Sequence, residues 1–497
     1  MPNPNQGAVA ERGRARDAMQ FVNEQDAATL ERFIERLEFR AKDPTFKGLR
    51  GDAGCGMSTA NRGGSKAMRR IIIGWAAVLA LGAALPSTAS ARGGPLSGEV
   101  IRDWNETARS QTFGNPLRLA RVLAIMHAAQ HDSVNGAEPR YRTYASNLYD
   151  SRADAEAAAA AGAHEVLAAF FPENRAALDD QLAASLSGVP DGDAEDAGVA
   201  LGRAVGAFVL EARMDDGFGT SDPFSPAPGP GVWEPTPPAL APMLEPQFQN
   251  VTPFTLRDRT QFLPDPQPSL TSRRYARDYN EVKLVGQDTS PARTPDQTHA
   301  AHFWAEPSPS GWSRVGNLVS ARYGYDLHRT ARLQALLNMA MADGFVVGWF
   351  QKRHFAFWRP VTAIREAGTD GNRATVPDPA WLSLRPTPPL PDYPSTHSLL
   401  GGAAAEILRR FTGTSAFPFC MVSTTSAPSG TERCWDSFTR AELENAESRV
   451  LVGFHFRFAI RTGVKVGRKV GRFAMRHSLL PLCRVRHHRH VDDALGR

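Results

Sequence analysis

Apolar residues recur at helical spacing along most of the chain. Between Val100 and His131 they fall on one face of a helix, and Pro116 stands where a second helix would begin. Strand-like alternation of apolar and polar residues is almost absent. The pattern therefore predicts an all-α helical bundle, with further helices at residues 152–171, 175–186, 194–214, 272–285, 297–305, 317–324 and 326–349.

Proline interrupts this pattern over residues 221–268, where neither a helix nor a central strand can form. A solvated linker would be polar, but this stretch carries many large apolar side chains. We therefore expect a long, ordered, extended connection that packs on the helical body through Trp233, Leu240, Met243, Leu244, Phe248, Phe254 and Phe262.

The N-terminal region carries a signal for export. Met68, Arg69 and Arg70 precede an apolar run over residues 71–85, and Ala89-Ser90-Ala91 follows it. This arrangement is typical of a secretory signal peptide that is cleaved after Ala91, with an uncleaved anchor as the alternative. We expect a periplasmic or extracellular protein.

The net charge of +5 is mild for 497 residues, and basic residues gather only at the extreme C-terminus, which argues against a nucleic-acid binder.

The chain is expected to comprise six segments. The segments are residues 1–67, an extraneous upstream addition; 68–91, the signal peptide; 92–220, an N-terminal helical region; 221–295, the proline-rich connector; 296–480, the catalytic helical region; and 481–497, a solvated basic tail.

Cysteine and histidine pairs give two secondary expectations. Cys420 and Cys434 lie close together in a stretch rich in Pro, Ser, Thr and Gly, so a disulfide is plausible in an oxidising compartment, with free thiols as the alternative. His127 and His131 are spaced to share a metal, but no third ligand is evident nearby. We expect this pair to serve packing.

Three short motifs between residues 352 and 455 carry the candidate chemistry. Lys352 and Arg359 are seven residues apart, which places them on one face if the segment is helical, and Pro360 marks the expected end of that helix or a turn. Ser395 precedes a run typical of a core helix and is expected at its N-cap, where free N–H groups favour an anion. Arg449 and His455 form the third motif, in which Gly453 allows a bend, and His397 follows Ser395. Together these residues are suited to holding a tetrahedral oxyanion.

In this order and at these spacings the motifs resemble the signature of the vanadium-dependent haloperoxidases and type 2 phosphatidic acid phosphatases: K-x6-R-P, P-S-G-H and S-R-x5-H-x3-D. Residues 119–135 and 233–254 resemble the N-terminal helix and the proline-rich connector of bacterial haloperoxidase-like members. The resemblance covers about residues 100–474.

The resemblance implies an exported enzyme that uses vanadate and hydrogen peroxide to oxidise a halide and so halogenate a small organic acceptor. It also allows a homodimer. The residues carried over would surround one oxyanion: Lys352, Arg359 and Arg449 as cations, with Lys352 also catalytic; Ser395 and the N–H of Thr396 as hydrogen-bond donors; His455 as the axial ligand of vanadium; and His397 as the acid–base group.

The chain departs from the signature at two positions. Thr396 replaces the usual glycine and is expected to add bulk near the anion, and Ala459 stands where the signature has aspartate. The usual orienter of an imidazole is thereby missing. Another carboxylate, such as Asp343 or Glu447, could substitute, and the sequence leaves its identity open.

Two other functions are compatible with the same residues. A soluble, exported acid phosphatase would use His455 as nucleophile and His397 to protonate the leaving group. A non-catalytic, anion-binding helical protein is the third reading, supported by Ala459 alone. No second long apolar run is present, which argues against a membrane-embedded lipid phosphatase.

Overall fold

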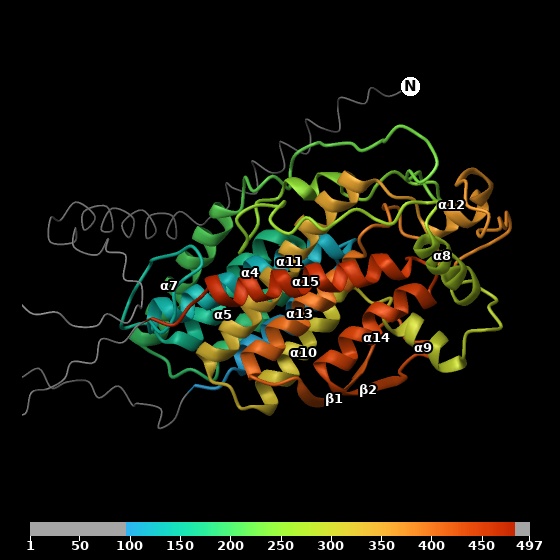
Figure 1. Ribbon diagram of the computed structural model, residues 1–497. Coiled ribbons are helices and arrows are strands. Elements are labelled where there is room, and N and C mark those ends of the chain that lie inside the picture. Colours follow the sequence, from blue (N-terminus) through green and yellow to red (C-terminus); the bar gives the residue numbers. More distant parts are fainter. Residues whose placement is uncertain (1–95, 483–497) are drawn as a thin grey trace, which may run out of the picture. The chain divides into compact units, whose positions relative to one another are not determined.

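The computed structural model describes residues 96–482 and confirms the all-α architecture (Figure 1). The upstream segment 1–67, the expected signal peptide and the basic residues 484–490 lie outside the described residues. The helices are α3 (Glu99–Ser110), α4 (Pro116–Ala137), α5 (Ala155–Phe170), α6 (Arg175–Leu186), α7 (Asp193–Ala212), α8 (Arg273–Val285), α9 (Pro295–Phe303), α10 (Ser308–Arg322), α11 (Leu327–Phe355), α12 (Pro360–Arg365), α13 (Thr396–Thr412), α14 (Phe438–Leu451) and α15 (Arg457–His477), with short 3-10 helices η2 (Pro172–Asn174), η3 (Pro246–Asn250) and η4 (Ala367–Thr369).

Helix α11 forms the centre of the molecule. It packs on α4 on one side and on α13 and α15 on the other, and Figure 1 shows these helices side by side. Among the described residues it is the one helix long and apolar enough to cross a membrane, and 94% of that apolar window is buried inside the protein. Lys352 lies at the end of this buried helix, so the core of the fold positions the first site residue.

Helix α4 settles the question of His127 and His131. Both imidazoles are buried. His127 hydrogen-bonds Gln130 at 2.8 Å and Asn105 at 3.0 Å, while the His131 Nε2 contacts the Arg142 carbonyl at 3.1 Å. The ring nitrogens thus bind protein groups, as expected for packing.

Helices α13 and α15 cross at very short range along a row of glycines. A Cβ at Gly463, Gly467 or Gly471 would overlap the backbone carbonyl oxygen of Ser395, Leu399 or Ala403, respectively. Only the absence of side chains on α15 lets the two helices approach this closely. The row ends beside Ser395, so the same contact holds the N-terminus of α13 in place.

We expect Gly467→Ala to lower the free energy of unfolding by about 3 kcal/mol, because the added methyl group has no space against the Leu399 backbone. Urea unfolding followed by circular dichroism measures the change. Lys469→Ala, on the exposed face of the same helix, is the matched control and should leave stability nearly unaltered. Equal stability of the two variants would contradict this account of the packing.

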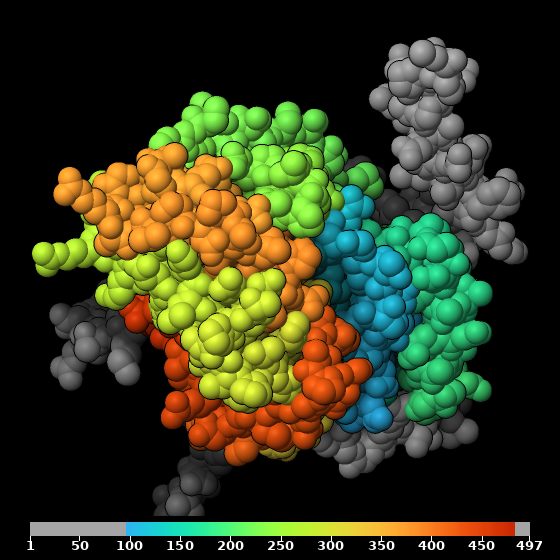
Figure 2. Space-filling model, turned by 90° about the vertical axis from the view of Figure 1, so that its right-hand side faces the viewer, coloured from blue at the N-terminus to red at the C-terminus, as the bar shows by residue number. Residues whose placement is uncertain are grey.

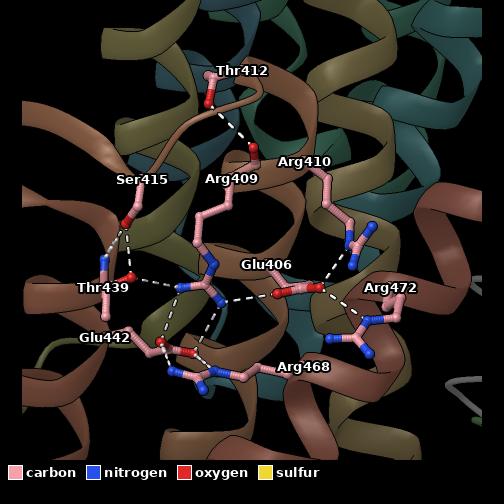
Figure 3. A network of polar contacts seen from close by, with 9 residues as sticks. All are labelled: Glu406, Arg409, Arg410, Thr412, Ser415, Thr439, Glu442, Arg468 and Arg472. Carbon is pink, nitrogen blue, oxygen red and sulfur yellow. Dashed lines mark hydrogen bonds and ion pairs between the residues drawn. The ribbon is translucent and has the colours of Figure 1, made fainter.

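Two buried glutamates tie the same helices together (Figure 3). Glu442 of α14 is fully buried and pairs with Arg409 at 3.0 Å and with Arg468 at 2.5 Å. Glu406 of α13 pairs with Arg409 at 3.1 Å, and also with Arg410 and Arg472. Arg409 bridges the two carboxylates, so α13, α14 and α15 are joined by one network rather than by separate ion pairs.

The proline-rich connector is ordered and packs on the helical body, as its apolar residues predict. Asp343, buried in α11, accepts hydrogen bonds from the backbone N–H groups of Phe254, Thr255 and Leu256 at 2.6 to 3.2 Å. Figure 2 shows the connector (green) as a continuous part of the surface. Leu240 departs from the prediction: it is 63% exposed, at a turn where its φ is +48°.

The stretch around the two cysteines forms two strands, although the sequence shows almost no strand-like alternation. Residues Ala416–Val422 (β1) and Glu432–Ser437 (β2) form an antiparallel hairpin in which Cys420 pairs with Cys434. The side chains of β1 alternate between exposed and buried, a pattern that Pro418 hides because proline argues against a strand. The disulfide between Cys420 and Cys434 is confirmed.

Candidate active site

Lys352 and Arg359 come together, but not on one helix as expected. Helix α11 ends at Phe355, because Ala356 adopts a left-handed conformation with φ of +45°. Arg359 follows in extended backbone, and Pro360 begins α12 rather than ending a helix. Both side chains are buried. The Lys352 Nζ donates to the Asp392 carbonyl at 3.0 Å and the Arg359 Nε to the Leu390 carbonyl at 2.5 Å, so the two cations converge on one segment.

His455 lies against a carboxylate that the sequence analysis missed. Its Nδ1 is 2.7 Å from Oδ1 of Asp392, a fully buried residue three positions before Ser395. The Arg359 Nη1 lies 3.1 Å from the His455 Nε2 and can only donate. The imidazole therefore carries its proton on Nδ1 and directs the lone pair of Nε2 toward the cations.

Asp392, not Asp343 or Glu447, orients the imidazole, which corrects the expectation. Asp343 is occupied by the connector, and Glu447 pairs with Arg457. Ala459 is fully buried among apolar side chains such as Phe456 and Phe458. Its carbonyl accepts from the Ser395 N–H at 3.1 Å. An aspartate at position 459 would thus enter an apolar cluster.

The electrostatics of the site favour an anion. Burial lowers the pKa of Lys352 well below its usual value, that of Arg359 to about 10 and that of Arg449 to about 9. Burial raises the pKa of Asp392 to about 7. Burial, followed by the charges of Arg359 and Lys352, lowers the pKa of His455, which keeps its ring neutral. Lys352 and Arg359 act on the Asp392 carboxyl group, whereas Arg449 feels the charge of Arg359 and, among the described residues, that of no carboxylate, so an oxyanion would balance the excess positive charge.

The N-terminus of α13 supplies the second motif. Ser395 is the N-cap, as expected, and its hydroxyl accepts from the Ser398 N–H at 3.4 Å. Thr396 points its side chain at α11: the missing Cβ of Gly348 would lie 2.6 Å from the Thr396 Oγ1. The bulk of the threonine is therefore accommodated by a glycine on α11, which corrects the expectation that it crowds the anion.

His397 and Arg449 complete the site through a shared carbonyl. The Arg449 Nη1 donates to the Trp304 carbonyl at 2.9 Å, and the same backbone hydrogen-bonds the His397 ring. The His397 Nδ1 also contacts the Ser308 Oγ at 3.0 Å. The Ser308 hydroxyl can donate to Nδ1 or accept from it, and the His397 Nε2 has no partner among the described residues. Ser308 is a further residue that the sequence analysis missed.

The groups fit a bound oxyanion such as vanadate. Within the described residues, the His397 Nε2 and the Arg449 Nε are buried and lack a hydrogen-bond partner. Buried donors and acceptors of this kind are normally satisfied, so they indicate a missing ligand. The charges of Arg449 and His397 also act on His455, which places both motifs around one centre. Lys352, Arg359, Arg449 and His397 thus lie close enough to His455 for their charges to act on it, and Ser395 and Thr396 directly precede His397 in the chain.

Comparisons with known proteins agree with this arrangement. Residues 332–481 match the family model of the VCPO second helical-bundle domain. The vanadium chloroperoxidase of Curvularia inaequalis is 27% identical, over 61% of this chain and 63% of that protein, so the chain spans less than two thirds of this relative.

Two solved structures share the fold. The first bacterial vanadium-dependent iodoperoxidase superposes with a TM-score of 0.68 and 25% identity, over 78% of this chain and 98% of that one. A holo-type bacterial vanadium-dependent chloroperoxidase gives a TM-score of 0.59 at 17% identity, over 77% and 98% of the two chains, and shows the fold alone. Residues 332–481 thus match a vanadium chloroperoxidase domain family, and the described part of the chain shares the fold of the bacterial vanadium-dependent iodoperoxidase.

Proposed function

We propose that the protein is an exported vanadium-dependent haloperoxidase, which uses vanadate and hydrogen peroxide to oxidise a halide and so halogenate a small organic acceptor. One observation carries the proposal. Asp392 holds His455 as a neutral imidazole whose Nε2 lone pair faces buried cations. A neutral ring nitrogen is what a metal centre binds, and the cations suit its oxygens.

Each side chain has a defined part in this function. Lys352, Arg359 and Arg449 would balance the charge of the vanadate oxygens, Ser395 and the Thr396 N–H would donate hydrogen bonds to them, and the His455 Nε2 would bind vanadium. When bound, vanadate supplies a Lewis acid that activates hydrogen peroxide toward halide. The unpartnered His397 Nε2 takes up and returns the proton of the incoming peroxide, while Ser308 and the Trp304 carbonyl hold its ring in place.

Export is part of the proposal. Residues 68–91 have the pattern of a signal peptide, and the disulfide between Cys420 and Cys434 suits an oxidising compartment. Cell fractionation of the full chain, with N-terminal sequencing of the product, tests the proposal. We expect mature protein that begins at Arg92 outside the cytoplasm, and full-length protein in the cytoplasm would contradict export.

The function itself is tested on the form that begins at Arg92. We expect bromide-dependent halogenation of a phenol dye with hydrogen peroxide, and only after loading with orthovanadate. The same preparation is assayed for phosphate release from an aryl phosphate. Phosphate release that orthovanadate inhibits, without halogenation, would overturn the proposal in favour of the acid phosphatase. Failure of both reactions would leave the site as an anion-binding pocket.

A further inference from the structure

A fourth cation lies beside the site without a role in the proposed set. Arg385 stands in the loop that follows Trp381, and this loop packs closely on the turn that carries His455. Leu384 packs against Leu451, Val452 and Phe454. A Cβ at Gly453 would lie 2.8 Å from the Ser383 Cβ, so little space separates the loop from the turn.

Arg385 is half-buried and has no carboxylate partner within the described residues. Its one side-chain hydrogen bond runs from Nη1 to the His302 Nδ1, at 3.4 Å. Since guanidinium only donates, His302 accepts at Nδ1 and carries its own proton on Nε2. The Arg385 donors and the His302 Nε2–H thus form a group of N–H donors with no oxygen acceptor among the described side chains.

This group adjoins the oxyanion site. The Arg449 guanidinium lies over the Phe454 ring at 5.0 Å, and Phe454 in turn packs near Leu384. Arg385 is close enough that its charge lowers the pKa of His302, after burial, and the pKa of Arg449, after burial and the charge of Arg359. A half-buried cation that repels its neighbours is stabilised by a bound anion.

We propose that Arg385 and His302 form a separate binding site for a monovalent anion, which takes up the halide substrate next to Arg449. As a halide site it rests on the proposed function. As an anion site it rests only on the unpaired Arg385 and the donors around it. A halide suits the group because it accepts several N–H donors in any direction, whereas a carboxylate or phosphate needs a paired geometry.

Anion binding is tested without vanadate, on the form of the protein that begins at Arg92. The measured quantity is the line width of the chloride-35 NMR signal of sodium chloride in the presence of this protein. We expect excess broadening that Arg385→Gln reduces by about half, because the central cations remain in that variant. Arg385→Lys keeps the charge and should retain most of the broadening. Arg373→Gln removes an exposed arginine from a surface loop and is the matched control. Equal line widths for Arg385→Gln and Arg373→Gln would overturn the site.

Steady-state kinetics of the vanadate-loaded enzyme distinguish a site for the halide substrate from a site that only binds anions. For Arg385→Gln we expect about a tenfold rise in the KM for bromide, with the KM for hydrogen peroxide within twofold, because loss of the charge affects anion recruitment. Unchanged bromide KM would exclude Arg385 as a halide residue. Wild-type protein that fails to halogenate, yet broadens chloride through Arg385, would reject the haloperoxidase function and retain the anion site.

Discussion

Replacement of His455 by alanine is expected to weaken vanadate binding more than about 100-fold and to abolish vanadate-dependent halogenation. The change removes the ring nitrogen that faces the cations. It also leaves the Asp392 Oδ1, 2.7 Å from the missing Nδ1, without its partner in a buried place. Equilibrium dialysis with orthovanadate measures the first effect and the dye assay the second.

Two controls distinguish loss of the His455 ring nitrogen from loss of the folded structure. His477→Ala removes an exposed imidazole at the end of α15 and should change neither quantity. Free imidazole added to His455→Ala should restore part of the activity, because it can occupy the space left by the ring. Wild-type affinity for vanadate in His455→Ala would exclude His455 as the ligand.

Removal of Asp392 is expected to have the second-largest effect. Asp392→Ala should reduce vanadate affinity and activity 10- to 100-fold, roughly the loss found when the group that orients a metal-binding imidazole is removed. It should also lower the free energy of unfolding by about 3 kcal/mol, because Lys352 and Arg359 lose the carboxylate that, among the described residues, balances their buried charge.

Asp392→Asn separates orientation from charge. The asparagine carbonyl can still accept the Nδ1 proton of His455, so we expect vanadate affinity between those of wild type and Asp392→Ala. Urea unfolding and vanadate dialysis are compared for both variants. Asp196→Ala, which removes an exposed carboxylate in the first turn of α7, serves as control. Ala459→Asp should not rescue Asp392→Ala, because its carboxylate would enter an apolar cluster.

The helices and most of the candidate site could be predicted from the sequence because local rules define them. Helix α6 matches its predicted bounds, since apolar periodicity and helix propensity act within a few residues. Ser395 is the N-cap because a serine before an apolar helix accepts its free N–H groups.

Long-range contacts decided the rest. Arg359 reaches Lys352 because Ala356 breaks the helix between them, and no spacing rule anticipates this. The hairpin forms around Pro418 because its partner strand and the apolar core cover one face. Thr396 fits because Gly348, on another helix, lacks a side chain.

The sequence by itself determined the helical class and the three motifs, whose residue types are suited to binding an oxyanion. It did not reveal which carboxylate serves His455: Asp392 is 63 positions away, and only tertiary packing brings the two together. The physical reason is burial. The sequence contains many carboxylates and does not show which of them are buried. A buried carboxylate requires a hydrogen-bond or charge partner, and the tertiary structure determines which group lies next to it.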